Sequence, residues 1–211
     1  MFNNGSKENY NLKKIGKLMI EGETNHLIVS DPSYSREQEE LLACRVANPR
    51  EGKWIGYIDW LDEDARVKTL FLVNESILRG LNGDEWKFQK SIGVDSAQCV
   101  ISLLQDFRQD SKIDASKIVN GFSDGDDLYY DACCDITLDY EYSAGMLPGG
   151  IVSRTGYGDG VYPVFVMKSG GIPIAVKIEF IFEEIDKRHT RNYNFGLAED
   201  YMSRGMNKFQ T

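Results

Sequence analysis

The stretch that decides the fold is residues 174–182, which reads IAVKIEFIF. Its apolar side chains stand at every second position, at Ile174, Val176, Ile178, Phe180 and Phe182. A period of two places such side chains on one face of an extended chain. The stretch therefore predicts a β-strand with one face in a hydrophobic core.

Similar extended patterns recur on either side of this strand. Short apolar or alternating segments occupy residues 15–20, 26–29, 54–60, 67–73, 86–94 and 161–167. The first two flank the turn Glu21-Gly22-Glu23 and are expected to form a hairpin. The last is apolar on both faces, which favours a central strand, although Pro163 cannot donate to a ladder of hydrogen bonds.

The segment 86–94 alternates, with Lys90 interrupting an apolar face. Because two separate segments share the same period, we expect their apolar faces to meet in one core. The residues expected to be buried together are Trp86, Phe88, Ile92, Ile178 and Phe180.

Helical patterns are fewer. Ser35 and Gln38 have the spacing of a capping box, which predicts a helix over 35–43. Residues 195–209 carry Phe195, Ala198, Met202 and Phe209 at helical spacing, with Gly205 interrupting them. These residues indicate a second, less regular helix.

Three other segments are read from local composition. Residues 96–107 fit a helix or a strand, and the pattern alone leaves both open. The glycine-rich stretches 121–127 and 145–150 predict loops. Cys133 and Cys134 are interpreted as small residues of a strand, with one of them packed inward.

Taken together, the elements predict a mainly β fold, a β-sandwich or partly open barrel with a few short helices. Strand-like segments on both sides of every loop need one another to form a sheet, so residues 1–211 are expected to form one domain. Residues 1–10 are interpreted as a loose N-terminal arm and residues 187–211 as a C-terminal extension.

Charge excludes one class of partner. The chain of 211 residues has a formal net charge of -9 at pH 7. A nucleic-acid groove needs lysine and arginine to neutralise phosphates, so no nucleic-acid partner is expected. An acidic surface instead attracts basic partners or cations.

No segment suggests export or a membrane. Residues 1–17 are polar and lack the apolar core of a signal peptide, and no apolar run is long enough to span a bilayer. We therefore expect a cytoplasmic protein without a membrane partner. In that compartment the four cysteines, which lack paired metal-binding spacing, are expected to be reduced thiols.

The most distinctive segment is residues 153–166, SRTGYGDGVYPVFV. Gly156 and Gly158 surround Tyr157 and precede Asp159, and such glycines permit tight backbone turns. Exposed amides there could cradle an anion. The interpretation we prefer is a structural hairpin loop with Asp159-Gly160 as its turn.

Several aspartates stand at the ends of turns or strands: Asp31, Asp95, Asp131, Asp135 and Asp159. Each could cap its own turn, and Asp31 before Pro32 is typical of that role. Carboxylates that converge can instead bind a cation or a ligand. A binding site is therefore expected where Asp95, Ser96 and Asp131 meet the loop of Gly156, Tyr157, Gly158 and Asp159.

Familiar catalytic patterns are missing from the sequence. The chain has two histidines, and no Gly-x-Ser-x-Gly motif is present. No cofactor and no metal site are expected from motifs.

Four segments in order resemble an uncharacterised family of bacterial domains of unknown function. They are GVDSAQ at 93–98, YDAC at 130–133, GYGDGVYPV at 156–164 and AVKIEF at 175–180. The resemblance covers roughly residues 31–182, and Ala97 stands where the family more often has glycine. It implies a strand after Gln98 and supplies no catalytic residues.

The sequence thus supports two functional hypotheses. The first is a non-enzymatic binding or protein-interaction domain whose partner is an unknown protein or small ligand, a basic one being what the acidic surface would attract. The alternative is a metal-assisted enzyme or small-ligand-binding protein that uses the aspartate cluster beside the glycine-rich loop.

Overall fold

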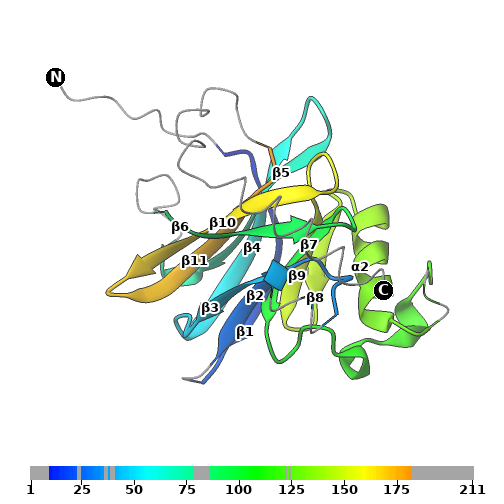
Figure 1. Ribbon diagram of the computed structural model, residues 1–211, viewed down its shortest axis with the longest axis horizontal. Coiled ribbons are helices and arrows are strands. Elements are labelled where there is room, and N and C mark those ends of the chain that lie inside the picture. Colours follow the sequence, from blue (N-terminus) through cyan, green and yellow to red (C-terminus); the bar gives the residue numbers. More distant parts are fainter. Residues whose placement is uncertain are drawn as a thin grey trace, which may run out of the picture.

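The protein folds into two antiparallel sheets that pack face to face (Figure 1). The computed structural model describes residues 10–22, 25–35, 38, 41–77, 86–121, 123 and 125–181. The six-stranded sheet has the order β1 (Leu12–Ile20), β4 (Gly52–Leu61), β5 (Arg66–Asn74), β11 (Ile172–Glu179), β10 (Gly160–Ser169), β6 (Lys87–Val94). The five-stranded sheet has the order β3 (Cys44–Ala47), β2 (His26–Ser30), β7 (Gln98–Leu103), β9 (Gly150–Arg154), β8 (Ala144–Leu147).

Helical structure in the described part is limited. Helix α2 (Leu128–Asp139) covers the outer face of the five-stranded sheet, as Figure 1 shows. The short 3-10 turns are η1 (Glu75–Ile77), η2 (Asp110–Lys112) and η3 (Ala115–Lys117). The prediction of a mainly β sandwich with few helices is confirmed. No helix of the described residues is long and apolar enough to cross a membrane.

The core lies between the two sheets. Trp54 and Ile58 of β4 meet Ile101 of β7 and Ile151 of β9, and all four side chains are fully buried. Burial of each of the three isoleucine side chains contributes about 1.5–3 kcal/mol. A second cluster joins Tyr129, Cys133 and Ile136 of α2 to the outer face of the five-stranded sheet.

Within the stretch 174–182, residues 174–179 form most of β11, and Phe180 and Ile181 follow the strand. Val176, Ile178 and Phe180 lie in the core between the sheets, as their period of two predicts. Ile174 belongs instead to the cluster on the outer face of the six-stranded sheet. The register with β10 shifts between Met167 and Lys168, so Ile174 lies at a bulge and the alternation breaks there. Phe182 lies outside the described residues.

The cluster expected around β6 forms only in part, and a second bulge explains why. Ile92 is buried with Ile178 and Phe180, but Phe88 is 40% exposed and Trp86 joins the outer-face cluster. The register with β10 shifts between Val164 and Phe165, so the alternation of 86–94 does not continue through the strand.

The expected hairpin of residues 15–20 and 26–29 is wrong. β1 pairs with β4 in the six-stranded sheet, whereas β2 pairs with β3 and β7 in the other sheet. The chain crosses between sheets where the sequence predicted a turn within one sheet. The sheet to which each strand belongs is set by its pairing with distant strands, and the residues of the local turn carry no information about that pairing.

The described part of residues 121–127 has no regular structure, as predicted. Two other local predictions need correction. Residues 145–150, expected to be a loop, lie in the antiparallel pair β8 and β9, joined by a turn at Pro148 and Gly149. Cys133 and Cys134 lie in α2 and not in a strand. The Asp127 side chain caps that helix by accepting from Tyr130 N, and a helical period buries one face against the sheet.

The remaining helical predictions have mixed outcomes. Residues 98–103 form strand β7, as the resemblance implied. The capping box is present, because Ser35 N donates to Gln38 Oε1 at 2.9 Å and Gln38 N donates to Ser35 Oγ at 3.4 Å. The segments 1–9 and 182–211, which include most of the predicted arm and the helix at 195–209, lie outside the described residues. Tyr10, the last residue of that arm, packs edge-on against Phe71.

The four cysteines give the first prediction. All four are free and buried, and burial raises the pKa of the Cys44 thiol to about 11 and those of Cys99 and Cys133 well above their usual range. Thiol labelling at pH 8 should therefore be about a hundredfold or more slower in the native protein than in denaturant. Denatured, unreduced protein should react at four sites, and a count of two would contradict the expectation of free thiols.

Candidate functional site

Three connecting segments meet at one end of the sandwich. Residues 95–97 join β6 to β7, and residues 155–159 join β9 to β10. Both connections cross from one sheet to the other, and they lie together because β6 pairs with β10 in one sheet and β7 with β9 in the other. The third segment, 31–35, follows β2. We call the group Asp31, Tyr34, Asp95, Ser96 and Asp159 the acidic corner.

Asp31 holds these segments together. Its side chain is fully buried, and Oδ1 accepts from Ser33 N, Ser33 Oγ and Ser96 Oγ, each at 2.7 Å. Its Oδ2 accepts from Asp95 N at 2.7 Å and Ser96 N at 2.8 Å. A buried carboxylate is tolerated only when such donors replace its water shell. The predicted local turn at Asp31 is thus present, and the long-range bonds to residues 95 and 96 were not anticipated.

Tyr34 links this clamp to Asp95. The tyrosine is 2% exposed, and its hydroxyl donates to Asp95 Oδ2 at 3.0 Å. Burial raises the pKa of Tyr34, and the nearby charges of Asp95, Asp31 and Asp159 raise it further. The hydroxyl is therefore a permanent donor at neutral pH, and it orients the Asp95 carboxylate.

The glycine-rich loop is tied to residue 97. Thr155 N donates to Ala97 O at 3.1 Å, and Ala97 N donates to Asp159 Oδ1 at 3.0 Å. Gly156 and Gly158 have φ of 46° and 114°, which explains the glycines at these positions. The preferred interpretation as a hairpin loop is wrong, because β9 and β10 lie in different sheets. Gly158 N donates to Thr155 O at 2.7 Å, so this amide is not free to hold an anion.

Ala97 itself has a φ of 55°, in the left-handed region. An alanine there carries strain that a glycine does not.

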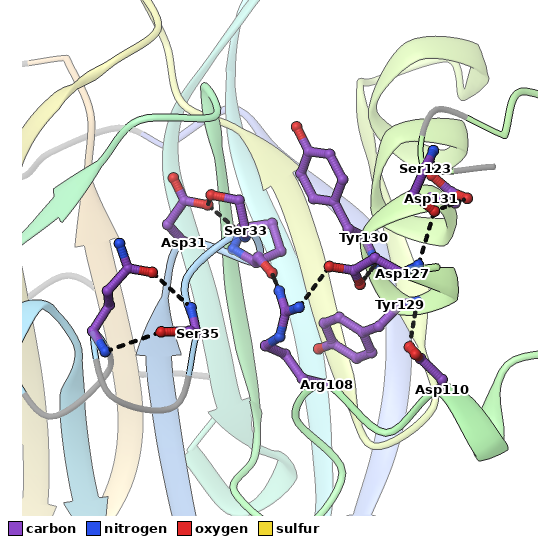
Figure 2. A network of polar contacts seen from close by, with 12 residues as sticks. Asp31, Ser33, Ser35, Arg108, Asp110, Ser123, Asp127, Tyr129, Tyr130 and Asp131 are labelled. Carbon is purple, nitrogen blue, oxygen red and sulfur yellow. Dashed lines mark hydrogen bonds and ion pairs between the residues drawn. The ribbon is translucent and has the colours of Figure 1, made fainter. Parts of the chain in front are cut away.

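Asp131 takes part in a different network. Its carboxylate accepts from Ser123 N at 3.0 Å and Ser123 Oγ at 2.8 Å, and so closes the loop before α2. Asp135 similarly accepts from the backbone of Val119 and Asn120. In Figure 2, Arg108 stands between Asp31 on one side and Asp131 on the other. The structure therefore brings together Asp95, Ser96, Gly158 and Asp159, and places the Asp131 carboxylate elsewhere.

Arg108 joins the acidic corner to α2. Its Nη1 donates to Pro32 O and its Nη2 to Asp127 Oδ2, both at 2.5 Å (Figure 2). Asp127 is the N-cap of α2, so one guanidinium fixes both the 31–35 segment and the start of the helix. A single arginine between a strand and a loop gives no pattern in the sequence, and sequence reasoning missed it.

The exposed part of the acidic corner consists of two carboxylates, and the exposed ring of Tyr157 belongs to the same loop as Asp159. Asp95 and Asp159 are exposed, and Tyr157 is 66% exposed. The Tyr157 hydroxyl donates to Asp64 Oδ2 at 3.2 Å, and the Arg66 guanidinium lies 4.9 Å from the ring centroid. Within the described residues, no group of three or more His, Cys, Asp and Glu side chains could hold a metal ion. The arrangement accepts hydrogen bonds and attracts cationic groups.

The Asp31 clamp can be tested by stability. Asn at position 31 keeps the size but loses the charge and turns one acceptor into a donor that faces backbone amides. Asp31→Asn should lower the free energy of unfolding by about 2–4 kcal/mol, measured as a shifted urea midpoint at unchanged slope. Asp159→Asn, whose Oδ1 can still accept from Ala97, should cost less than about 1 kcal/mol. Equal costs for the two variants would argue against the clamp.

Tyr34 gives a prediction on pH. Below about pH 10 both states keep the phenolic proton; above it the unfolded chain loses this proton while folded Tyr34 retains it, so stability falls as pH rises. Tyr34→Phe should therefore be less stable at pH 7 by about 1 kcal/mol, yet lose stability less steeply between about pH 10 and pH 12. Urea unfolding at several pH values measures both effects, and parallel pH curves for the two proteins would contradict the prediction.

Comparison of the chain with protein-family models, curated proteins and solved structures found no match. The family resemblance of the four sequence segments therefore stays a prediction, and the functional argument rests on the geometry of the acidic corner.

Proposed function

We propose that this protein is a non-enzymatic binding domain whose acidic corner takes up a basic group of a partner. The observation that carries the proposal is that Asp95 and Asp159 are both exposed, on two connections that the buried Asp31 carboxylate and the Ala97 backbone hold in place. The partner's group would be an arginine or lysine side chain, or a small cation with several donors.

The two exposed carboxylates retain capacity to accept hydrogen bonds. Asp95 uses one oxygen for Tyr34, and Asp159 uses one for Ala97. An ionised carboxylate offers about four lone-pair positions on two oxygens, so each group can accept from a further donor. A guanidinium fits such carboxylates through two parallel hydrogen bonds.

Tyr157 adds a second attraction for the same kind of group. Arg66 of the same chain lies over its ring, and this contact is of the same kind as the one proposed for the partner's basic group. The rest of the exposed ring is available to a partner. Tyr157 stands two positions before Asp159 in the same loop.

The corner is also fixed before a partner arrives. Asp31 holds residues 95 and 96, Ala97 holds the 155–159 loop, and both connections are anchored by paired strands. A preorganised site loses little conformational entropy on binding. The net charge of -9 steers basic partners toward the protein but does not by itself choose this surface.

The proposal is tested by titrating short arginine-containing and lysine-containing peptides and a neutral glycine–serine peptide, with calorimetry at low and at high salt. We expect binding of the basic peptides only, weaker at high salt. The double variant Asp95→Asn/Asp159→Asn should weaken binding about tenfold or more, and Tyr157→Ala should weaken it about threefold.

A charge-matched control separates a site from general attraction. Glu51→Gln/Asp126→Asn removes the same two charges from exposed positions outside the corner. This control should bind nearly as well as the parent protein. Equal weakening in the two double variants, or no binding of any basic peptide, would contradict the proposal.

A further inference from the structure

A groove beside helix α2, at the outer face of the five-stranded sheet, is separate from the acidic corner. It lies between α2, strand β8 and the η2–η3 segment, and has a volume of about 310 Å³. Its floor is apolar, with Ile113, Ile118, Ile136, Met146 and Leu147 among the lining residues. We call it the α2 groove.

We infer that the α2 groove is the docking site of this chain's own C-terminal segment, residues 195–209. The inference is independent of the acidic corner. Three observations carry it: the apolar floor with lysines at its rim, the amphipathic pattern of the segment, and the length of chain available to reach the groove.

The groove is suited to a few apolar side chains. A volume of about 310 Å³ stands at the lower end for sites that enclose a small molecule, which run from roughly 300 to 1,000 Å³. An exposed apolar side chain continues the surface beside it, because Val119, which follows the lining residue Ile118, is 78% exposed. An amphipathic helix that inserts one or two anchors and covers the neighbouring surface fits this shape.

Charge at the rim favours an acidic residue next to the apolar anchors. Lys112 and Lys117 line the groove and are paired with Asp106 and Asp114, yet they remain 48% and 79% exposed. Asp114 and Asp135 also line the groove; the Asp114 carboxylate pairs with Lys117, and that of Asp135 is taken up by two backbone amides.

The segment 195–209 has the matching pattern. Phe195, Met202 and Phe209 stand at helical spacing on one face, and Met206 falls on the same face. Glu199 is four residues after Phe195 and three before Met202, so on a helix it stands beside this apolar face. With the face in the groove, Glu199 can meet one of the rim lysines.

The chain is long enough for this contact. Ile181, the last described residue, lies against Gly156, just past the end of β9. The groove begins at the opposite end of β9, next to Leu147 and Pro148, and the five residues of β9 span about 17 Å. Residues 182–194 number thirteen and can span up to about 43 Å.

The test uses the full chain with a nitroxide spin label on Ser203→Cys, next to the expected apolar face. The native cysteines are buried and should not react with the label. Methyl signals of Ile113, Ile136 and Met146 should lose intensity about twofold or more, because a tether of this length gives an effective concentration near the millimolar range. Met202→Asp in the same labelled chain should restore the intensity.

Two controls decide the outcome. A label on Ser169→Cys, at the β10–β11 hairpin far from α2 in Figure 1, should leave these methyl signals unchanged. Mixing spin-labelled chains with separate isotope-labelled chains tests whether a second copy fills the groove. The inference is overturned if Ser203→Cys has no effect beyond that of Ser169→Cys, if Met202→Asp does not restore the signals, or if the mixed sample shows the same loss.

Discussion

The buried carboxylate of Asp31 is the interaction on which the functional end of the molecule depends. It accepts five hydrogen bonds, three of them from residues more than sixty positions away in the chain. Hydrogen bonds to a charged group contribute about 1.5–3 kcal/mol each when well formed, and leaving such a charge unpaired in the interior costs more. Residues 31–33 and 95–96 therefore adopt one relative position, which sets the direction of Asp95.

Two guanidinium contacts extend this order to either side. Arg108 ties the carbonyl of Pro32 to the N-cap of α2, and Arg66 donates to the carbonyl of Gly156 and lies over Tyr157. The segments of the acidic corner are thus hydrogen-bonded both to the start of α2, through Arg108, and to the six-stranded sheet, through Arg66. The α2 groove is affected as well, because the position of α2 on its sheet sets one of its walls.

Much of the fold could be predicted from local pattern, and the candidate site only in part. The alternation in 174–182 placed Val176, Ile178 and Phe180 in the core, and Ser35 and Gln38 form the capping box that their spacing indicates. The glycines of 155–159 were recognised as a backbone requirement. Their partner Ala97 and the clamp residue Asp31 were not placed with them, since no spacing along the chain encodes contacts made across 60 or more residues.

The sequence by itself determined that this protein is β-rich, acidic and built on strands of period two, because side-chain alternation is a property of the extended chain alone. Only the tertiary structure decided which strands share a sheet, where the bulges at Ile174 and beside Phe165 reverse that alternation, and that Cys133 and Cys134 belong to a helix. It also decided that Asp159 binds the backbone of Ala97, two residues after Asp95, while Asp131 faces Ser123. The reason is physical: strand partners and buried polar groups are chosen by the shape and hydrogen-bonding needs of the whole core, and these exist only once distant segments have come together.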